Sequence, residues 1–421
     1  MITNTIYYWW LRFFFAYVDL RFNRLTALPA EIGKLQSLQK LFLRFNRLVD
    51  LPDEIGQLSS LEVLSIRQNR LRSVSASIST LASLKVLDLQ HNRLTTLPSL
   101  GNKPQLSILD LQYNLLESLP ADIAGLTALT RLHLKYNQLT ELPGTMIQSL
   151  TRLVELDLEG NRLSQVPEQI GMLVNLRKIY LSRNRIGSLP AQFANLMRTE
   201  ELYIDQNAIA SLDPILGLPE LRVLQCSHNE LTALSDGISR LTSLKDLYAG
   251  SNRIATISPE IGHLRNLMHL DLNDNALTGL PSEIGDVERL RVLNLEGNVI
   301  KRLPAEIGRL QALETLHVGY NSMEELTSEI GALKKLKELN LDENRLKALP
   351  SEVGLCHSLE VLSFNENEID DLPNSLYQLD QLRLFGMDDN PLSALPPEVT
   401  EGGSQEVFNF LGERLKQDQE H

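Results

Sequence analysis

The sequence is poor in cysteine, in glycosylation sites and in net positive charge, and each shortage excludes a class of protein. Cys226 and Cys356 are the only cysteines among 421 residues, so no disulfide framework holds the fold together. Asparagine is abundant, yet no Asn-x-Ser/Thr sequon occurs, so nothing indicates a glycosylating compartment. A formal net charge of −13 argues against general affinity for nucleic acid or anionic membrane. We therefore expect a cytoplasmic protein with no nucleic-acid partner and no membrane insertion.

Signatures of catalysis are missing as well. The sequence contains no Gly-rich phosphate loop, no C-x-x-C pair, no H-E-x-x-H motif and no G-x-S-x-G motif. Each serine or aspartate that lies near a histidine is explained by the repeated pattern described next. We therefore predict that the protein is not an enzyme and that it carries no cofactor.

An asparagine recurs along almost the whole chain at an interval of 23 residues, with slips to 22 or 24. The seventeen positions are Asn23, Asn46, Asn69, Asn92, Asn114, Asn137, Asn161, Asn184, Asn207, Asn229, Asn252, Asn275, Asn298, Asn321, Asn344, Asn367 and Asn390. Around each one runs the pattern L-x-x-L-x-L-x-x-N-x-L-x-x-L-P-x-E-I-G-x-L. This period predicts an α/β leucine-rich repeat solenoid, a curved horseshoe in which each repeat stacks on its neighbours.

Each consensus position has a physical role. In the L-x-L strand Leu339 and Leu341 point inward, while Asn340 faces outward, because side chains alternate along a strand. Stacked strands then form a parallel sheet on the concave side. The asparagine amide can satisfy buried backbone groups of neighbouring coils. The proline of the L-P step, as at Pro350, forbids a long helix, so short turns or 3₁₀ segments are expected on the convex side.

Several repeats depart from the pattern. The repeat around residues 98–105 is one residue short, and the repeat around residues 144–150 is one residue long. The proline is replaced by Asp213, Ser235 and Ser258 in three successive repeats, where we expect altered curvature or weak packing. Both cysteines replace inward leucines and are interpreted as small core residues rather than reactive thiols.

The two ends differ from the repeats. Residues 1–16 form an irregular, densely aromatic segment, interpreted as a cap or as a misassigned start. It is too short for a membrane span and lacks the basic region of a signal peptide. The solenoid of about 17 repeats is predicted over residues 17–399. A capping helix follows over residues 400–416, in which Val407, Phe408, Leu411 and Leu415 recur at helical spacing, and residues 417–421 form a tail.

The outward positions of the concave face carry a charge gradient. Two residues before the asparagine the series starts with Arg21, Arg44 and Arg67, and one residue after it stand Arg24, Arg47, Arg70 and Arg93. The C-terminal third is acidic at Asp271, Asp274, Glu338, Asp342, Glu343, Glu366, Asp388 and Asp389. Stacked like charges about 5 Å apart repel, so this arrangement favours a binding role over a merely solvated face.

Aromatic residues interleave with these charges at outward positions, where few core contacts are available to them. The predicted protein-binding residues of the concave face are Arg21, Phe42, Arg44, Phe45, Arg67, Tyr113, Lys135, Tyr136, Tyr180, Tyr203 and Tyr248. Histidines on this face fall in non-adjacent repeats, roughly 10 Å or more apart, which is too far to share a metal ion. No metal site is therefore predicted.

The run L-P-x-E-I-G-x-L at 23-residue spacing, as at residues 303–310, resembles the intracellular Ras-group leucine-rich repeat proteins. That group includes the Ras–RAF scaffold, which assembles a small GTPase with protein phosphatase 1. The ending N-P-L at residues 390–392, followed by G-S-Q-E-V-F-N-F-L, is similar to the segment closing the main array of leucine-rich repeat-containing protein 40. The resemblance implies protein partners on the concave face, with a small GTPase or a phosphatase complex as candidates. The phosphatase-docking motif R-V-x-F is absent from the N-terminal segment.

Three functions are weighed on these grounds. The first is a non-enzymatic intracellular scaffold or adaptor, monomeric alone, that acts in small-GTPase signalling. The second is a sensing or immune-type receptor fragment, which would predict a signal peptide, cysteine caps and sequons. The third is the substrate-recognition arm of a ubiquitin ligase, whose catalytic activity a partner would supply.

Overall fold

The computed structural model describes residues 16–101 and 103–420. The chain divides into two compact units, Met1–Ala208 (unit 1) and Ile209–His421 (unit 2). The predicted aromatic N-terminal segment lies outside the described residues, except for Ala16. The first strand begins at Tyr17, where the repeats were predicted to begin.

Unit 1 is built from nine described strands that pair in parallel and in chain order. The strands are β1 (Tyr17–Asp19), β2 (Lys40–Phe42), β3 (Val63–Ser65), β4 (Val86–Asp88), β5 (Ile108–Asp110), β6 (Arg131–His133), β7 (Glu155–Asp157), β8 (Lys178–Tyr180) and β9 (Glu201–Tyr203). The returning segments contain the 3₁₀ turns η1 (Ala30–Lys34), η2 (Asp53–Gln57), η3 (Ala76–Thr80), η4 (Ala121–Gly125), η5 (Glu168–Met172) and η6 (Ala191–Asn195), and the α-helical turn α2 (Gly144–Ile147).

Unit 2 repeats this arrangement and adds a second small sheet and two C-terminal helices. Its parallel strands are β10 (Val223–Gln225), β12 (Asp246–Tyr248), β14 (His269–Asp271), β15 (Val292–Asn294), β16 (Thr315–His317), β17 (Glu338–Asn340), β18 (Val361–Ser363) and β19 (Leu384–Gly386). The small sheet pairs β11 (Ala233–Leu234) with β13 (Thr256–Ile257). The turns are η7 (Asp213–Ile215), η8 (Asp236–Arg240), η9 (Pro259–His263), η10 (Ser282–Asp286), η11 (Ala305–Arg309), η12 (Ser328–Ala332), η13 (Ser351–Leu355) and η14 (Asn374–Gln378), followed by the helices α3 (Pro397–Glu401) and α4 (Ser404–Glu420).

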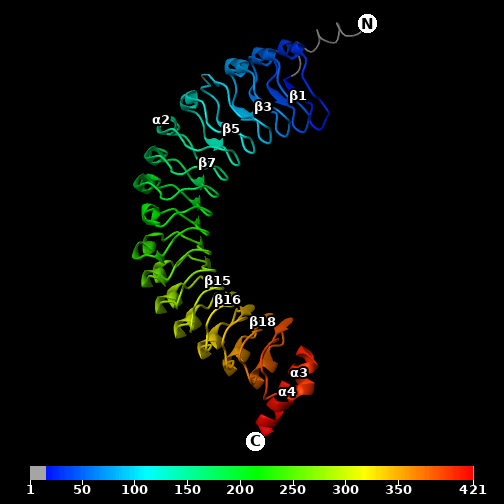
Figure 1. Cartoon of the computed structure of the whole chain (residues 1–421), viewed down its shortest axis with the longest axis vertical. Helices are drawn as coiled ribbons and strands as arrows, with labels where there is room; N and C mark the ends of the chain where they lie inside the picture. Colours follow the sequence, from blue (N-terminus) through cyan, green and yellow to red (C-terminus); the bar gives the residue numbers. More distant parts are fainter. Residues whose placement is uncertain (1–15, 102, 421) are drawn as a thin grey trace. The chain divides into compact units, whose positions relative to one another are not determined.

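Within each unit the strands line one side of the coil and the 3₁₀ turns line the opposite side (Figure 1). Leu339 and Leu341 are fully buried, and Leu339 pairs in register with Leu362 of the next strand. The prolines before the turns are extended, as at Pro304 with φ −68° and ψ 149°, and no long helix follows them. This confirms the predicted solenoid, with a parallel sheet on one side and short 3₁₀ turns on the other.

The repeated asparagine joins its own coil to the preceding one. The Asn298 Nδ2 group donates to the carbonyl oxygens of Leu272 (3.0 Å) and Leu295 (2.9 Å). Its Oδ1 accepts a hydrogen bond of 2.9 Å from the Leu277 backbone N–H. These bonds satisfy backbone groups that the core would otherwise leave unpaired, as the sequence predicted.

Each irregular repeat is accommodated by a local change in backbone structure. In the long repeat the extra residue is absorbed by the α-helical turn α2, closed by a bond of 3.0 Å from the Gln148 N–H to the Gly144 carbonyl. In the middle stretch, serine replaces proline and supplies a backbone donor. The Ser258 N–H bonds the Leu234 carbonyl at 2.9 Å, which a proline could not do, and β11 pairs with β13. The predicted irregularity there takes the form of an added strand pair.

Both cysteines are free and fully buried, as predicted for core residues. Burial raises the pKa of the Cys356 thiol to about 11, which keeps it protonated and unreactive at neutral pH.

The helix α4 covers the end of unit 2, and it is longer than predicted. Its Val407 and Leu411 side chains are buried, and Phe408 packs edge-on against Phe385 at 4.9 Å between ring centroids. Arg414 holds Asp371 with two bonds, of 2.8 and 3.1 Å. Since no proline or glycine interrupts residues 417–420, the helix continues through them to Glu420, and the predicted tail is wrong over those four residues.

Candidate protein-binding surface

The surface beside the strands, called the strand face, is built from the same outward positions in every coil. The last strand residue points outward, as do the residues two and one before the asparagine and the one after it. In the second coil these are Phe42, Arg44, Phe45 and Arg47. Because β2 and β3 pair in register, each outward residue stacks on its equivalent in the next coil, about 4.8 Å away.

The residue before the asparagine is left-handed in every repeat, with φ between 49° and 68°. This conformation turns the chain inward to the buried asparagine. The side chain of the left-handed residue itself stays at the surface. In unit 1 the position holds a column of rings, the aromatic ladder, formed by Phe22, Phe45, His91, Tyr113 and Tyr136. Phe22 and Phe45 stack at 4.5 Å between centroids, and Tyr113 stacks on His91 at 4.2 Å and on Tyr136 at 4.9 Å. Ring faces therefore cover one another, and the ring edges face outward.

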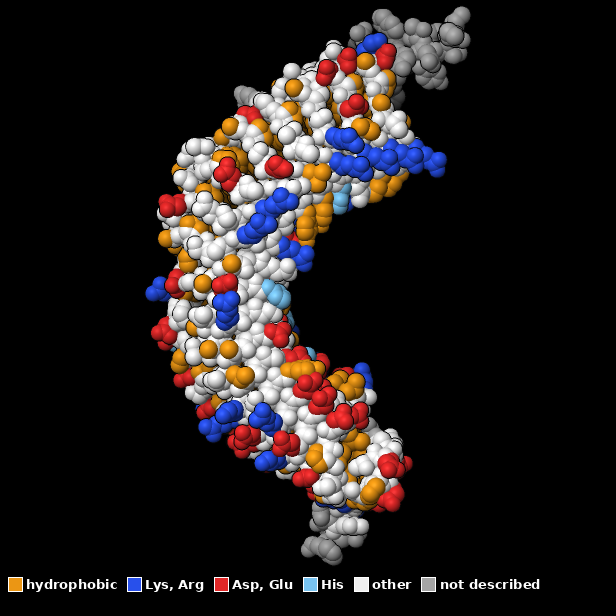
Figure 2. Space-filling model, viewed as in Figure 1, with side chains coloured by type: hydrophobic (Ala, Val, Ile, Leu, Met, Phe, Trp, Pro, Cys, Tyr) orange, Lys and Arg blue, Asp and Glu red, His pale blue; other side chains and the backbone are white. Residues whose placement is uncertain are grey.

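A cluster of cations, the arginine patch, lies on the first four coils of unit 1. It consists of Arg24, Arg44, Arg47, Arg67, Arg70 and Arg93. None of these side chains forms an ion pair with a residue that the structure describes. The Arg44 guanidinium instead lies 5.7 Å from the Phe22 ring centroid and 6.0 Å from that of Phe45. Figure 2 shows Lys and Arg side chains gathered on this side of unit 1.

Two arginines of the patch have a buried N–H donor that makes no hydrogen bond to a described residue. Within the described residues, the Nε–H groups of Arg44 and Arg67 are buried atoms without a hydrogen-bond partner. The neighbouring Gln68 Oε1 is in the same state. Unpaired buried polar atoms are costly, so these side chains would gain hydrogen bonds if they turned toward a partner that supplies matching groups.

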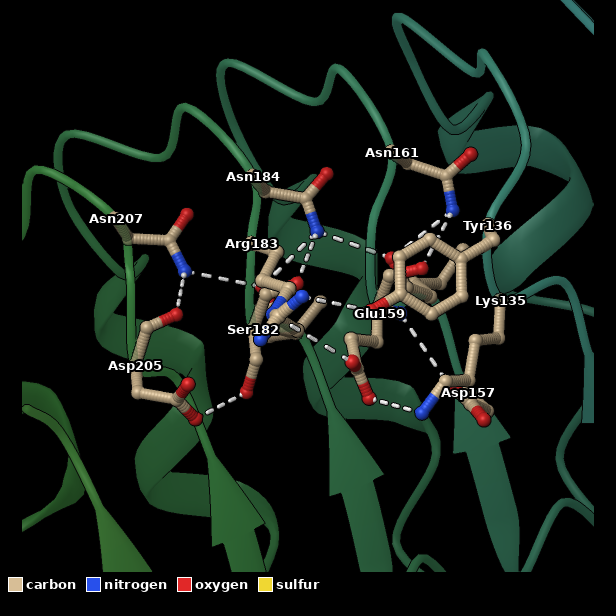
Figure 3. Close-up of polar contacts among 12 residues, drawn as sticks. Lys135, Tyr136, Asp157, Glu159, Asn161, Ser182, Arg183, Asn184, Asp205 and Asn207 are labelled. Carbon is tan, nitrogen blue, oxygen red and sulfur yellow. Dashed lines mark hydrogen bonds and ion pairs between the residues drawn. The ribbon is translucent and has the colours of Figure 1, made fainter.

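Some charged residues of the later coils of unit 1 pair with one another. Lys135 pairs with Glu159 at 2.5 Å, and the Arg183 Nη1 group donates to the Tyr136 hydroxyl at 2.9 Å (Figure 3). Arg183 also lies 3.9 Å from the Glu159 carboxylate. Lys135 and Tyr136, both predicted binding residues, therefore belong to a closed polar network rather than to the arginine patch.

The predicted tyrosine anchors lie beyond this network. Tyr180 and Tyr203 stack at 4.7 Å on neighbouring strands, and each is half-buried. Burial, together with the nearby Glu201 carboxylate, raises the pKa of each phenol to about 12, so both stay neutral. Tyr248 stands alone in unit 2, where burial likewise raises its pKa.

Buried or half-buried carboxylates occupy the last strand position in the middle of unit 1. The Ser65 hydroxyl donates to Asp88 at 2.7 Å, and burial raises the Asp88 pKa above its ordinary value. Burial raises the pKa of Asp157 to about 6. For His133, burial lowers the pKa but the contacts with Asp110 and Glu155 outweigh it, and the pKa is raised overall.

The equivalent columns of unit 2 are acidic. Its last coils carry Glu343, Glu366 and Asp389 before the asparagine, and Asp342 and Asp388 one position earlier. None of the five pairs with a described lysine or arginine. Asp and Glu side chains gather toward the C-terminal end of this unit in Figure 2. We call these five residues the acidic patch.

The structure places all eleven predicted binding residues on the strand face, but it does not bring them into one site. Arg21, Phe42, Arg44, Phe45 and Arg67 lie together on the first three coils, and Arg21 is neutralised by an ion pair with Asp19. Tyr113 joins the aromatic ladder and the remaining residues lie further along. Sequence reasoning missed His91 and Gln68 as members of the ladder column. Their position directly before an asparagine could have found them.

No described helix is long and apolar enough to cross a membrane. In the same residues, no three His, Cys, Asp or Glu side chains are grouped closely enough to hold a metal ion.

Comparison with known proteins agrees with the repeat pattern. A profile described as "Leucine rich repeat" matches residues 16–71, 36–94, 104–163, 250–300 and 334–392, which together exceed half of the chain. A profile described as "Leucine-rich repeat region" matches residues 281–346. The chain belongs to the leucine-rich repeat family. Proteins of this family are typically non-catalytic protein–protein interaction modules. No curated protein sequence matches this leucine-rich repeat chain significantly.

Solved leucine-rich repeat structures resemble it over most of its length. A leucine-rich repeat protein of Leptospira interrogans is 31% identical with a TM-score of 0.79, and the match covers 88% of this chain and 95% of that one. The plant peptide hormone receptor RGFR1 in complex with RGF2 is 26% identical with a TM-score of 0.60, covering 89% and 74%. The Arabidopsis receptor kinase HAESA, in complex with the peptide hormone IDA and the co-receptor SERK1, is 25% identical with a TM-score of 0.68, covering 88% and 70%.

Proposed function

We propose that this leucine-rich repeat protein is a non-enzymatic adaptor that binds an acidic protein surface through the strand face of unit 1. The observation that carries the proposal is the arginine patch, whose six cations have no described carboxylate partner. Equivalent arginines in adjacent coils lie about 5 Å apart and repel one another, so an acidic partner would relieve a cost that the free protein bears.

The aromatic ladder beside the patch supports the same proposal. Phe22 is 67% exposed and Phe45 is 37% exposed, so both offer apolar ring edges next to the guanidinium groups. Aromatic and arginine side chains are enriched where protein interfaces draw most of their binding energy. In this proposal Arg44, Arg67 and Phe45 form the centre of the interface. Tyr180 and Tyr203 lie toward its edge.

The proposed setting is the cytoplasm, and the proposed partner class is a Ras-type small GTPase. The motif resemblance to Ras-group leucine-rich repeat proteins supports this choice, and the effector-binding face of such GTPases is acidic. The absence of sequons and the scarcity of cysteine support the cytoplasmic setting.

The alternative is a recognition or sensing subunit, with any catalysis supplied by a partner. It is favoured by two of the similar structures, which are receptors in complex with a peptide ligand. In that case the strand face would bind an extended peptide rather than the surface of a folded protein.

Proximity labelling and affinity capture with the full chain test the proposal. The test variant is Arg44→Glu with Arg67→Glu, and the matched control is Arg162→Glu with Arg185→Glu, exposed arginines of later coils in the same unit. We expect the test variant to lose the acidic partners that the wild-type chain captures, and the control to retain them. Capture should weaken as salt rises. An unchanged set of partners in the test variant would overturn the proposal.

A further inference from the structure

The arginine patch is too dense for an ordinary acidic segment. Its two columns place two arginines on each of the second and third coils, and neighbouring coils lie about 4.8 Å apart. An extended partner chain presents side chains on one face only every 6.8 Å or so, and each carboxylate brings a single negative charge. Carboxylates arranged in this way would leave much of the positive charge unbalanced.

The described carboxylates of this face form no ion pair with the six arginines of the patch. Asp19 is held by Arg21 through its side-chain hydrogen bonds. Asp88 accepts from the Ser65 hydroxyl, and Asp110 accepts from the Gln90 amide at 3.0 Å. Across the first four coils, then, the described carboxylates of the strand face are engaged elsewhere, and the six arginines are left to a ligand.

The unused donors define the kind of anion that fits. The Nε–H of an arginine and a neighbouring Nη–H form a fork that binds two oxygens of one anion. Arg44 and Arg67 occupy equivalent positions in adjacent coils, and each holds an unused Nε–H that would reach an anion once the side chain turns outward. Rotating the Gln68 side-chain amide by half a turn would replace its unpaired oxygen with an NH₂ donor. A phosphomonoester has three acceptor oxygens and a charge of about −1.5 to −2, so one such group can engage both forks.

The aromatic ladder argues for a phosphorylated protein over a nucleic acid. Many of its ring faces are already stacked on each other, as in the pairs Phe22–Phe45 and His91–Tyr113, so few ring faces are left for a series of bases. The net charge of −13 also disfavours a long polyanion. Ring edges can contact the backbone and the apolar side chains on either side of a phosphorylated residue.

We propose that the arginine patch of unit 1 binds a phosphorylated protein segment and holds one phosphomonoester between Arg44 and Arg67. Arg47, Arg70 and Arg93 would then engage acidic or phosphorylated residues that flank it. This inference rests on the proposed function and specifies the chemistry of the partner.

Fluorescence anisotropy with the full chain tests it. The probes are three degenerate peptide libraries that differ only in a fixed central residue, which is phosphoserine, glutamate or serine. We expect the phosphoserine library to bind at least about tenfold tighter than the glutamate library. Arg44→Lys with Arg67→Lys keeps the charge but removes the forks, and it should abolish this preference. The control Arg162→Lys with Arg185→Lys should keep it.

Two results would overturn the inference. The first is equal affinity for the phosphoserine and glutamate libraries, and the second is equal or tighter binding of inorganic polyphosphate or single-stranded DNA of matched charge. If either occurs while Arg44→Glu with Arg67→Glu still abolishes capture of acidic proteins, the proposed function stands and only the phosphate assignment fails. If capture is also unaffected, both fail.

Discussion

The strand faces of the two units share one backbone plan, but the first coils of unit 1 and the last coils of unit 2 carry opposite charges. The residue two before the asparagine is Arg44 in unit 1 and Asp342 in unit 2, and the residue directly before it is Phe45 in one and Glu343 in the other. Phe45 and Glu343 have nearly the same backbone angle, with φ of 59° and 50°. Because strand side chains alternate in direction, the outward residues can change without disturbing the leucines behind them. The comparison shows that the coil fixes where a side chain is presented and leaves its chemistry open.

A second difference lies in how charge is compensated. Within unit 1 the six arginines of the arginine patch are unpaired among the described residues, while later coils join Lys135, Glu159 and Arg183 in one network. The acidic patch of unit 2 resembles the first case with the sign reversed. The two patches are therefore stretches of unpaired charge of one sign, on which a partner of opposite charge would have a large effect.

If the two units share a backbone plan, replacing the asparagine should lower the free energy of unfolding by the same amount in both. Asn161 and Asn298 are both buried, and each donates to two carbonyl oxygens at 2.9–3.0 Å and accepts from one N–H. We expect Asn161→Ala and Asn298→Ala each to lower the free energy of unfolding by about 1–3 kcal/mol, because buried backbone groups lose their partners. Urea titration of both variants measures this. A loss below a few tenths in either would show that the ladder is not structural there.

The repeated part of the fold could be predicted from the sequence because the same residue types occupy the same structural positions in successive coils. The asparagine recurs seventeen times, the leucines at inward positions nearly as often and the proline twelve times, so the period itself identifies strand, turn and core. The buried Leu339 and Leu341, and the hydrogen bonds of Asn298, were predicted on that basis.

What the sequence could not predict depends on contacts between particular side chains. The closed network of Lys135 and the free Nε–H groups of Arg44 and Arg67 follow from side-chain rotamers, which the repeat does not fix. The stacking of Phe45 on Phe22 could not be predicted without knowing that both residues have a left-handed backbone. Residues that break the period, such as Lys103, needed a coil-by-coil alignment to stand out.

The short coils of the two units differ at one buried position, which is Lys103 in unit 1 and Leu218 in unit 2. Both residues are fully buried. The Lys103 Nζ group donates to the carbonyls of Ser79 (3.2 Å) and Leu81 (3.1 Å) at the end of η3, and burial lowers its pKa to about 8. Lys103→Met should make the unit 1 coil like its counterpart and raise the free energy of unfolding at pH 7 by about 2 kcal/mol.

The pH dependence separates this effect from packing. Between about pH 8 and 10.5 the folded chain has lost the Lys103 proton while the unfolded chain keeps it, so stability of the wild type rises with pH in this window. Lys103→Met should flatten that rise, whereas Leu218→Met should leave it unchanged. Chemical denaturation at several pH values provides the measurement. An identical slope in wild type and Lys103→Met would mean that the amine is not titrating there.

The last strand position holds an aspartate in both units, Asp157 and Asp271, and burial raises the pKa of both. For Asp157 the folded pKa is about 6 against an ordinary 3.8, so the folded state binds more protons between these values and stability falls as pH rises through the window. Asp157→Asn should remove this fall and raise the free energy of unfolding at pH 7.5 by about 1–2 kcal/mol.

Asp271→Asn is the matched variant, and it should give a smaller gain because Asp271 is more exposed than Asp157. Thermal melts between pH 4 and 8 would report both effects. Equal gains in the two variants would contradict the difference in burial between the columns.

The smallest expected effect concerns the two glycines that stand directly before an asparagine, Gly160 in unit 1 and Gly297 in unit 2. Both have a left-handed backbone, with φ of 68° and 67°. A methyl group at Gly160 would lie 2.4 Å from the Tyr136 ring, while at Gly297 it would lie 2.5 Å from the carboxylate oxygen of Asp274, an exposed side chain.

The backbone cost of alanine is the same at both glycines, because their φ angles match, so any difference isolates the ring contact. We expect Gly160→Ala to be about 1 kcal/mol more destabilising than Gly297→Ala, since Tyr136 must leave its stack on Tyr113 and its hydrogen bond from Arg183. Adding Tyr136→Ala to each variant completes the cycle and should remove most of the difference. If the two glycine variants unfold at the same urea concentration, the ring moves without loss, and the end of the aromatic ladder is not held as the contacts imply.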